Sequence, residues 1–308
     1  MKLDDQIHTK IGYAVLGLLI SSIAGQEQVQ AAPAENPPEM NDSMIRKSQV
    51  EGTINVVMGK GAKTDYLTRC KAAQALGAEL AEDEVNTLYL LLGRKVGEDE
   101  LPEGQLNGLK DVVAALLDNQ KALPASYPDT LMTMYKDRSY DPVWRDYCIQ
   151  HLGAVCSSIK DDQKLQEVKE VCWKATEETD GGIAGTALIT LSKNMKTLGI
   201  EKPTLATRAF EILTDPKSGE ASKITALQIC AQLGEKRALP IARQLFGADA
   251  SIPMKLSAIA AIGALGDASD LPALKPYQTG RDSRLRPAVN AAIKRIEGRT
   301  TQMTGDQI

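Results

Sequence analysis

The sequence predicts an all-α fold, an α-solenoid of about seven helical-hairpin repeats between residues 63 and 298. Two observations predict it. A short segment rich in Ala, Leu and Gly recurs along the chain, and no stretch shows the sustained alternation of polar and apolar residues that marks strands. The composition agrees, because 43% hydrophobic residues can fill a sizeable core and 4% aromatic residues suits close stacking of Ala- and Leu-rich helices.

The recurring segment is clearest in four copies that align without a gap: RCKAAQALG, RDYCIQHLG, ALQICAQLG and AIAAIGALG. Three weaker copies fill the intervals: LKDVVAALL, AGTALITLS and VNAAIKRIEG. Each copy carries a large apolar anchor near its end, at Leu76, Leu116, Leu152, Leu191, Leu233, Leu265 and Ile296. Successive anchors lie 31 to 42 residues apart, a spacing that suits one pair of helices per repeat.

Each copy predicts an amphipathic helix, because its apolar and small residues recur at offsets of three, four and seven and therefore share one face. Small residues on that face allow the backbones of neighbouring helices to approach closely. A glycine directly follows four of the anchors, at Gly77, Gly153, Gly234 and Gly266. In these places a left-handed C-cap would end the helix and turn the chain.

A second helix is expected after four of the copies, over residues 81–95, 161–178, 203–213 and 235–247. A first helix of the pattern A-x-x-A-x-x-A-L-G followed by a second helix resembles the HEAT repeat, in particular the short bacterial variety found in bilin lyases. The resemblance covers about residues 63–298 and implies stacked repeats with one continuous core. The tetratricopeptide repeat has a similar period, but its signature of Trp, Leu-Gly, Tyr and Pro is missing from the sequence.

Residues 1–31 are expected to be a signal peptide, with an N-terminal membrane anchor as the alternative. The uncharged apolar run Ile11–Ala24 has 14 residues, which is the length of a signal-peptide core and too short to span a membrane. Ala31 offers a small residue before a cleavage point, whereas Asp4 and Asp5 weaken the basic start that signal peptides prefer. Both alternatives imply export, to the periplasm or the extracellular space.

Two further segments are expected to lack a fixed fold. Residues 32–62 begin with the Pro- and Ala-rich stretch AAPAENPPEMNDS, which predicts a flexible linker that leads into the first repeat. Residues 299–308, which contain TTQMTGDQI, predict a disordered tail.

No motif predicts a catalytic, cofactor or metal site. Residues 58–64, MGKGAKT, look like a phosphate-binding loop, but the first glycine of that motif is replaced by Ile54. His151 is the only histidine after the signal segment, which excludes multi-histidine metal sites, and its place near a helix C-terminus favours a structural role. The five cysteines contain no C-x-x-C pair. We therefore expect a protein that is not an enzyme and holds no cofactor.

Cys148 and Cys172 are candidates for a disulfide, because an exported protein meets oxidising conditions. If they lie on facing antiparallel helices that turn near residue 160, both stand twelve residues from the turn and thus at the same height. Packed helix axes usually lie about 8 to 10 Å apart, which is long for a disulfide, so packed free thiols are the alternative.

Aromatic residues gather around the third repeat. Four of them are candidates for a partner-binding surface: Tyr140, Trp144, Tyr147 and Trp173. Exposed Trp and Tyr side chains often dominate the binding energy of protein interfaces. Packing of the same rings in the core is the alternative.

The charge pattern argues against nucleic acid as a partner, because the formal net charge is −4 and phosphate binding needs a basic field. Charge is also distributed unevenly. Residues 78–103 hold eight acidic and two basic residues, whereas residues 275–299 hold seven basic and two acidic residues. The two ends of the repeat region thus differ in sign, which can steer a partner.

These features predict a non-catalytic scaffold in the cell envelope or periplasm that binds a protein or a peptide. Membrane contact is expected only through an uncleaved N-terminal segment. Two alternatives remain. One is a structural component of a membrane-anchored envelope assembly, and the other is a lyase resembling the HEAT-like bilin lyases, for which the sequence offers no matching catalytic residue.

Overall fold

The computed structural model describes residues 40–60, 64–178, 181–279 and 282–305, and every regular element in these ranges is a helix. The chain divides into two units, Met1–Met44 and Ile45–Ile308. The predicted signal or anchor segment, residues 1–31, lies outside the described residues. The helical repeats belong to the second unit.

Seven helices carry the recurring segment: α2 (Tyr66–Ala75), α4 (Glu103–Asp118), α6 (Pro142–Val155), α8 (Ile183–Lys193), α10 (Glu220–Leu233), α12 (Ile252–Leu265) and α14 (Arg286–Gly305). The other helices are α1 (Met40–Val57), α3 (Glu82–Leu92), α5 (Tyr127–Lys136), α7 (Asp162–Ala175), α9 (Lys202–Thr214), α11 (Ala238–Gly247) and α13 (Leu271–Leu274). Short 3-10 turns lie at Cys156–Ser158, Ala268–Asp270 and Lys275–Tyr277. All seven predicted copies are helical, and the four predicted companion helices are confirmed as α3, α7, α9 and α11.

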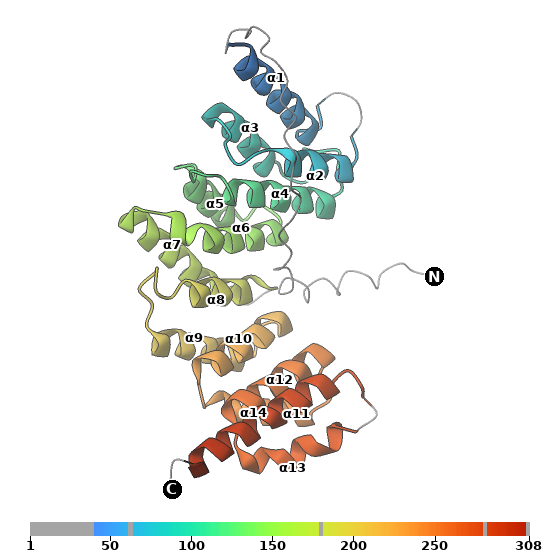
Figure 1. Ribbon diagram of the computed structural model, residues 1–308, viewed down its shortest axis with the longest axis vertical. Helices are drawn as coiled ribbons and strands as arrows, with labels where there is room; N and C mark the ends of the chain where they lie inside the picture. Colours follow the sequence, from blue (N-terminus) through green and yellow to red (C-terminus); the bar gives the residue numbers. More distant parts are fainter. Residues whose placement is uncertain (1–39, 61–63, 179–180, 280–281, 306–308) are drawn as a thin grey trace, which may run out of the picture. The chain divides into compact units, whose positions relative to one another are not determined.

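The even-numbered helices form one layer, because each packs against the next even-numbered helix from α2 and α4 to α12 and α14. The odd-numbered helices from α3 to α13 each pack on the even-numbered helix that follows in the chain. The resulting helix pairs succeed one another in chain order within the second unit (Figure 1). The predicted all-α solenoid is confirmed.

The hairpins have a different phase from the one that the sequence suggests. The sequence pattern pairs each recurring helix with the helix after it, but α6 packs closely on α5 and only marginally on α7. In the same way α10 packs closely on α9 and little on α11. A recurring helix is thus the second helix of its hairpin, and the turn after it leads to the next repeat. The first helix of the α6 hairpin is α5, which the sequence analysis misses.

Small residues on the even-numbered helices allow close packing inside their layer. A Cβ atom added to Gly153 in α6 would lie 2.8 Å from the Thr190 side chain in α8, and the Thr190 hydroxyl donates to the Ile149 carbonyl of α6 at 3.2 Å. Gly153 is therefore a packing residue inside a helix and not the C-cap that its sequence position predicts. The predicted left-handed cap is present at Gly234, with a φ of 72°, whereas Gly266 is extended.

One hydrophobic core runs through the repeats from Ile54 to Ile296. Because each repeat buries its apolar face only against its neighbours, we expect the stability of the solenoid to be approximately a sum over adjacent repeats.

The structure differs from the sequence-based expectation at both ends of the repeat region. Helix α1 occupies much of the predicted flexible segment 32–62, and its residues Ile54 and Val57 are buried in the core. Burial of such apolar side chains stabilises a helix that its polar composition would not maintain alone. At the other end α14 continues to Gly305, into the predicted disordered tail 299–308.

Candidate binding site

The prediction that Trp144 belongs to a partner-binding surface is wrong. Its side chain on α6 has no solvent exposure. The Lys110 ammonium group of α4 lies 5.0 Å from the centre of the Trp144 ring and 5.2 Å from that of Tyr140. Lys110 also donates to the Arg94 carbonyl, and burial lowers its pKa to about 8. The sequence cluster of aromatic residues thus partly reflects the packing of rings around a buried cation.

Tyr140 and Tyr147 are half-buried and pack against the core. The Tyr140 hydroxyl donates to the Gly93 carbonyl at 3.0 Å, and the Lys95 ammonium group lies 5.0 Å from the ring centre. Tyr140 therefore serves contacts within the protein. Of the four candidates, Trp173 on α7 is the one that lines a hollow in the surface.

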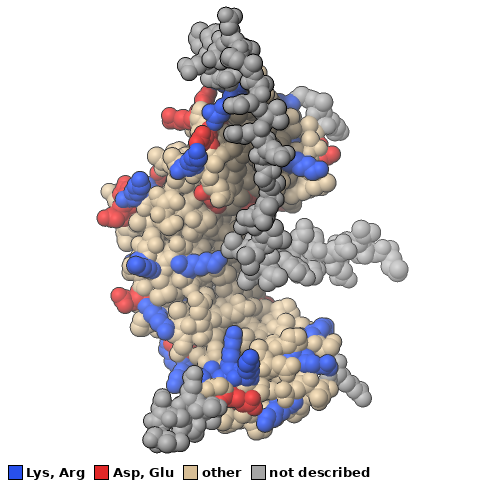
Figure 2. Space-filling view, viewed as in Figure 1, with Lys and Arg blue, Asp and Glu red and all other residues tan. Residues whose placement is uncertain are grey.

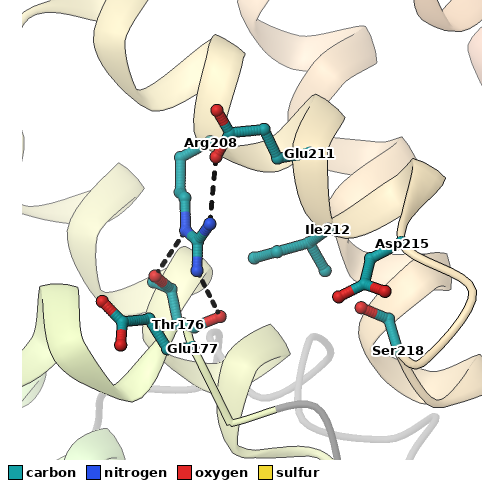
Figure 3. Close-up of a pocket in the computed structure, with 7 residues that line it drawn as sticks. All are labelled: Thr176, Glu177, Arg208, Glu211, Ile212, Asp215 and Ser218. Carbon is teal, nitrogen blue, oxygen red and sulfur yellow. Dashed lines mark hydrogen bonds and ion pairs between the residues drawn. The ribbon is translucent and has the colours of Figure 1, made fainter.

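The hollow lies between the C-terminal half of α7 and the helix α9, and we call it the α7–α9 groove. Its outer part has a volume of about 510 Å³ and is lined by Trp173, Glu177, Pro203, Thr204, Thr207, Arg208 and Glu211. Its inner part has a volume of about 230 Å³ and is lined by Thr176, Glu177, Arg208, Glu211, Ile212, Asp215 and Ser218. The two parts share Glu177, Arg208 and Glu211, so they form one continuous groove. Figure 3 shows the residues that line the inner part.

Arg208 holds the two walls of the groove together. Its Nε donates to the Thr176 hydroxyl at 2.8 Å and its Nη2 to the Thr176 carbonyl at 3.1 Å, just beyond the end of α7. Its Nη1 pairs with Glu211 one turn along α9 at 2.9 Å. Figure 3 shows the guanidinium between these partners. Arg208 thus acts mainly as an internal clamp between α7 and α9.

The inner end of the groove is acidic and polar. Asp215 follows α9 and accepts a hydrogen bond from the Lys217 backbone N–H at 2.9 Å. Ser218 is 7% exposed, and within the described ranges its hydroxyl has no hydrogen-bond partner. In Figure 3 both side chains point toward the inner part of the groove, beside Ile212. Of the residues that line the groove, the sequence predicted Trp173 alone. Asp215 and Ser218 were among those missed, because no sequence signal marks the loop after α9.

The predicted disulfide between Cys148 and Cys172 is absent, and all five cysteines are free, buried thiols. Burial raises the pKa of both Cys148 and Cys172 well above the ordinary thiol value. The reason for the error is the phase of the hairpins. Cys148 lies on α6 and Cys172 on α7, which belong to different hairpins and pack on each other only marginally.

His151 has a structural environment, but not the one expected at a helix end. Its ring lies between two carboxylates, with Nδ1 at 2.6 Å from Asp118 and Nε2 at 3.0 Å from Asp111, both on α4. Burial alone would lower the pKa of His151, but the two carboxylates outweigh this effect and raise the pKa to about 9. His151 is therefore a cation at neutral pH that links α4 to α6.

The described residues contain no group of three or more His, Cys, Asp or Glu side chains placed to hold a metal ion. None of the described helices combines the length and the apolar character that a membrane crossing needs.

The acidic run of residues 78–103 is partly used inside the protein. Asp99 is buried between Arg69 at 2.7 Å and Arg94 at 2.5 Å. Burial raises the pKa of Asp99, but the hydrogen bonds from the two guanidinium groups outweigh this and hold the pKa well below its usual range. Lys and Arg side chains on the helices from α9 onwards remain at the surface, as Figure 2 shows for one face.

No protein-family model matches the chain, and no curated protein sequence matches it. Among the solved structures that match are two helical-repeat proteins. Human deoxyhypusine hydroxylase in complex with glycerol shares 16% sequence identity with a TM-score of 0.39, and the match covers 83% of this chain and 99% of that chain. The designed armadillo repeat protein YIII(Dq)4CqI shares 12% identity with a TM-score of 0.36, over 80% of this chain and 99% of that chain.

The expectation that the protein is not an enzyme is corrected by the first of these comparisons. A similar helical-repeat structure is a hydroxylase, so the architecture and the lack of a recognised motif do not establish a non-catalytic protein. Both similarities concern the helical-repeat fold, and neither neighbour's activity is carried over to this chain.

Proposed function

We propose that the protein is a solenoid scaffold that binds a segment of another protein, or a peptide, in the α7–α9 groove. The observation that carries the proposal is the position of Trp173, an indole that lines a groove of about 510 Å³ together with Pro203 and polar side chains. Partly exposed indoles beside a concave surface are frequent centres of binding energy in protein interfaces. The clamp between Arg208 and Thr176 keeps the two walls of the groove at a set spacing before a ligand arrives.

The proposal is tested with a displayed library of random peptides selected against the purified protein. We expect selected peptides to lose most of their affinity for Trp173→Ala, because the substitution removes the indole from the groove wall. Leu90→Ala is the matched control, since Leu90 is a 68% exposed apolar residue on α3 and does not line the groove. Equal loss in both variants, or no selected peptide that depends on Trp173, contradicts the proposal.

The proposal includes export, with action in the periplasm or elsewhere outside the cytoplasm. Its support is the uncharged run Ile11–Ala24 that follows Lys2 and Lys10. N-terminal sequencing of the protein taken from its native cells tests this. A mature chain that starts near Ala32 supports a cleaved signal peptide. A chain retained in the membrane with its first residues intact favours the anchored alternative.

A further inference from the structure

We infer that the α7–α9 groove recognises a basic segment, with a Lys or Arg side chain of the partner directed at Asp215 and Ser218 in the inner part. The inference rests on the proposed function, because it names the chemistry of the ligand for the same groove. Three observations carry it: the balance of charges in the lining, the unpartnered groups at the inner end, and the indole at the outer end.

The lining carries three carboxylates, Glu177, Glu211 and Asp215, against one guanidinium, Arg208. The donors of Arg208 are engaged by Thr176 and Glu211, so little of its hydrogen-bonding capacity is left for a ligand. An anionic ligand would therefore meet the like charge of the carboxylates, while three of the five N–H donors of this guanidinium are already used, and such an arrangement is unfavourable. A cationic ligand meets complementary charge.

Two of the nearby cations are themselves paired. Lys174, near the end of α7, forms an ion pair with Glu177 just beyond that helix. Arg237 forms hydrogen bonds with Glu235 and stacks 4.5 Å from the centre of the Phe210 ring. Asp215, in contrast, forms no ion pair within the described parts of the chain and accepts only the Lys217 backbone N–H. Its negative charge is thus available to a ligand.

Ser218 supplies the second, independent observation. The residue is 7% exposed, and its hydroxyl faces the inner part of the groove with no hydrogen-bond partner among the residues that the structure describes. Its hydroxyl oxygen can accept a hydrogen bond from a ligand donor that enters the groove. The ammonium group of Lys and the guanidinium of Arg offer only donors, so they suit an acceptor pair formed by Ser218 and Asp215.

The outer part of the groove favours a peptide over a small cation. Trp173 and Pro203 line it with apolar surface, and Thr204 and Thr207 add hydroxyl groups that can bond a peptide backbone. The outer volume of about 510 Å³ exceeds what a single ammonium group fills. The groove therefore matches an extended segment that places one cationic side chain inward and its backbone beside the indole.

The test uses three acetylated and amidated heptapeptides with a fluorescent label, in which Ala alternates with Lys, Gln or Glu. Fluorescence anisotropy gives the affinities, and acrylamide quenching reports protection of Trp173, because Trp144 is fully buried and the chain has no other tryptophan. We expect the Lys peptide to bind at least tenfold more tightly than the Gln peptide, to protect Trp173, and to weaken as NaCl rises. The Glu peptide should not bind.

Asp215→Asn keeps the acceptor for the Lys217 backbone N–H and removes the charge, so it should weaken the Lys peptide roughly two- to fivefold. The double variant with Asp215→Asn and Ser218→Ala should bind the Lys peptide more weakly still. Glu82→Gln is the control, since it removes an exposed carboxylate from α3, far along the chain from the groove. Circular dichroism checks that each variant is folded.

Three results decide the inference, and they show whether the proposed function stands without it. If Trp173 is protected equally by the Gln or Glu peptide, the groove binds peptides but does not select basic ones, and the inference is overturned while the proposed function stands. If the Lys peptide binds without protection of Trp173 or without loss in Asp215→Asn, its site lies elsewhere and the inference is also overturned. If no peptide from the three or from the displayed library depends on Trp173, the inference and the proposed function are both overturned.

Discussion

Gly263 of α12 and Ala292 of α14 pack so closely that a Cβ atom added to Gly263 would lie 2.7 Å from the Ala292 Cα and 2.8 Å from its Cβ. Both atoms belong to a helix that is held by its neighbours, so neither can move aside as a flexible side chain would. The small residues of the recurring segment thus determine how closely adjacent even-numbered helices approach.

Gly263→Ala is therefore expected to destabilise the protein by about 1 to 3 kcal/mol, because the added methyl group overpacks the contact between the two helices. Gly298→Ala in α14 is the matched control, since a Cβ atom there meets nothing within 4 Å. It should stabilise the protein by roughly 0.5 to 1 kcal/mol through its better helix propensity. Urea unfolding measures both. The same sign for the two variants contradicts the role given to Gly263.

His151 is expected to stabilise the fold in a pH-dependent way. Its pKa is raised from 6.5 to about 9, so its contribution is fully present below about pH 6.5 and is lost as the pH rises through 9. The full contribution is about 3 kcal/mol from the size of the shift. NMR titration of the imidazole tests the pKa, and the stability difference between the wild type and His151→Gln should shrink between pH 6 and pH 10. A constant difference would argue against this.

Protonation of Lys110 is expected to lower the stability of the fold, whereas protonation of His151 raises it. Burial lowers its pKa from 10.5 to about 8, so the folded state releases the proton first and stability rises with pH between about 8 and 10.5. In Lys110→Met this rise, of about 3 kcal/mol, should disappear, because the side chain keeps its length among the rings of Tyr140 and Trp144 without a charge. Lys136→Met, on the exposed side of α5, should leave it in place. Denaturant unfolding as a function of pH is the measurement.

The cysteines are expected to be unreactive in the folded protein, since all five are buried. Unfolding in an alkylating reagent without reductant should then add five labels, which intact mass spectrometry counts. A mass two labels short, with a linked peptide that contains Cys148 and Cys172, would restore the disulfide that the structure lacks.

Much of the fold could be predicted from the sequence, because it depends on local periodicity. Six of the seven anchors lie on even-numbered helices and Leu76 directly follows α2, and the offsets of three, four and seven place small residues on the face that the next helix covers. The candidate site was predicted only in part. Trp173 lines the groove, whereas Trp144 surrounds Lys110, and no property of the two residues in sequence separates these outcomes.

The sequence by itself determined the seven recurring helices, four of their companions, the repeat and the composition of the packing face, since each of these depends on residues within a few turns of one another. Only the tertiary structure decided which helices pair. The stacking of these pairs on one another depends on contacts between residues far apart in the chain, such as Thr190 with Ile149 or Arg208 with Thr176. The placement of Cys148 away from Cys172, the cation between Tyr140 and Trp144, and the acidic inner end at Asp215 and Ser218 all follow from that pairing. Side chains from different repeats come into contact only when the repeats stack, so these contacts cannot be predicted from a local sequence pattern.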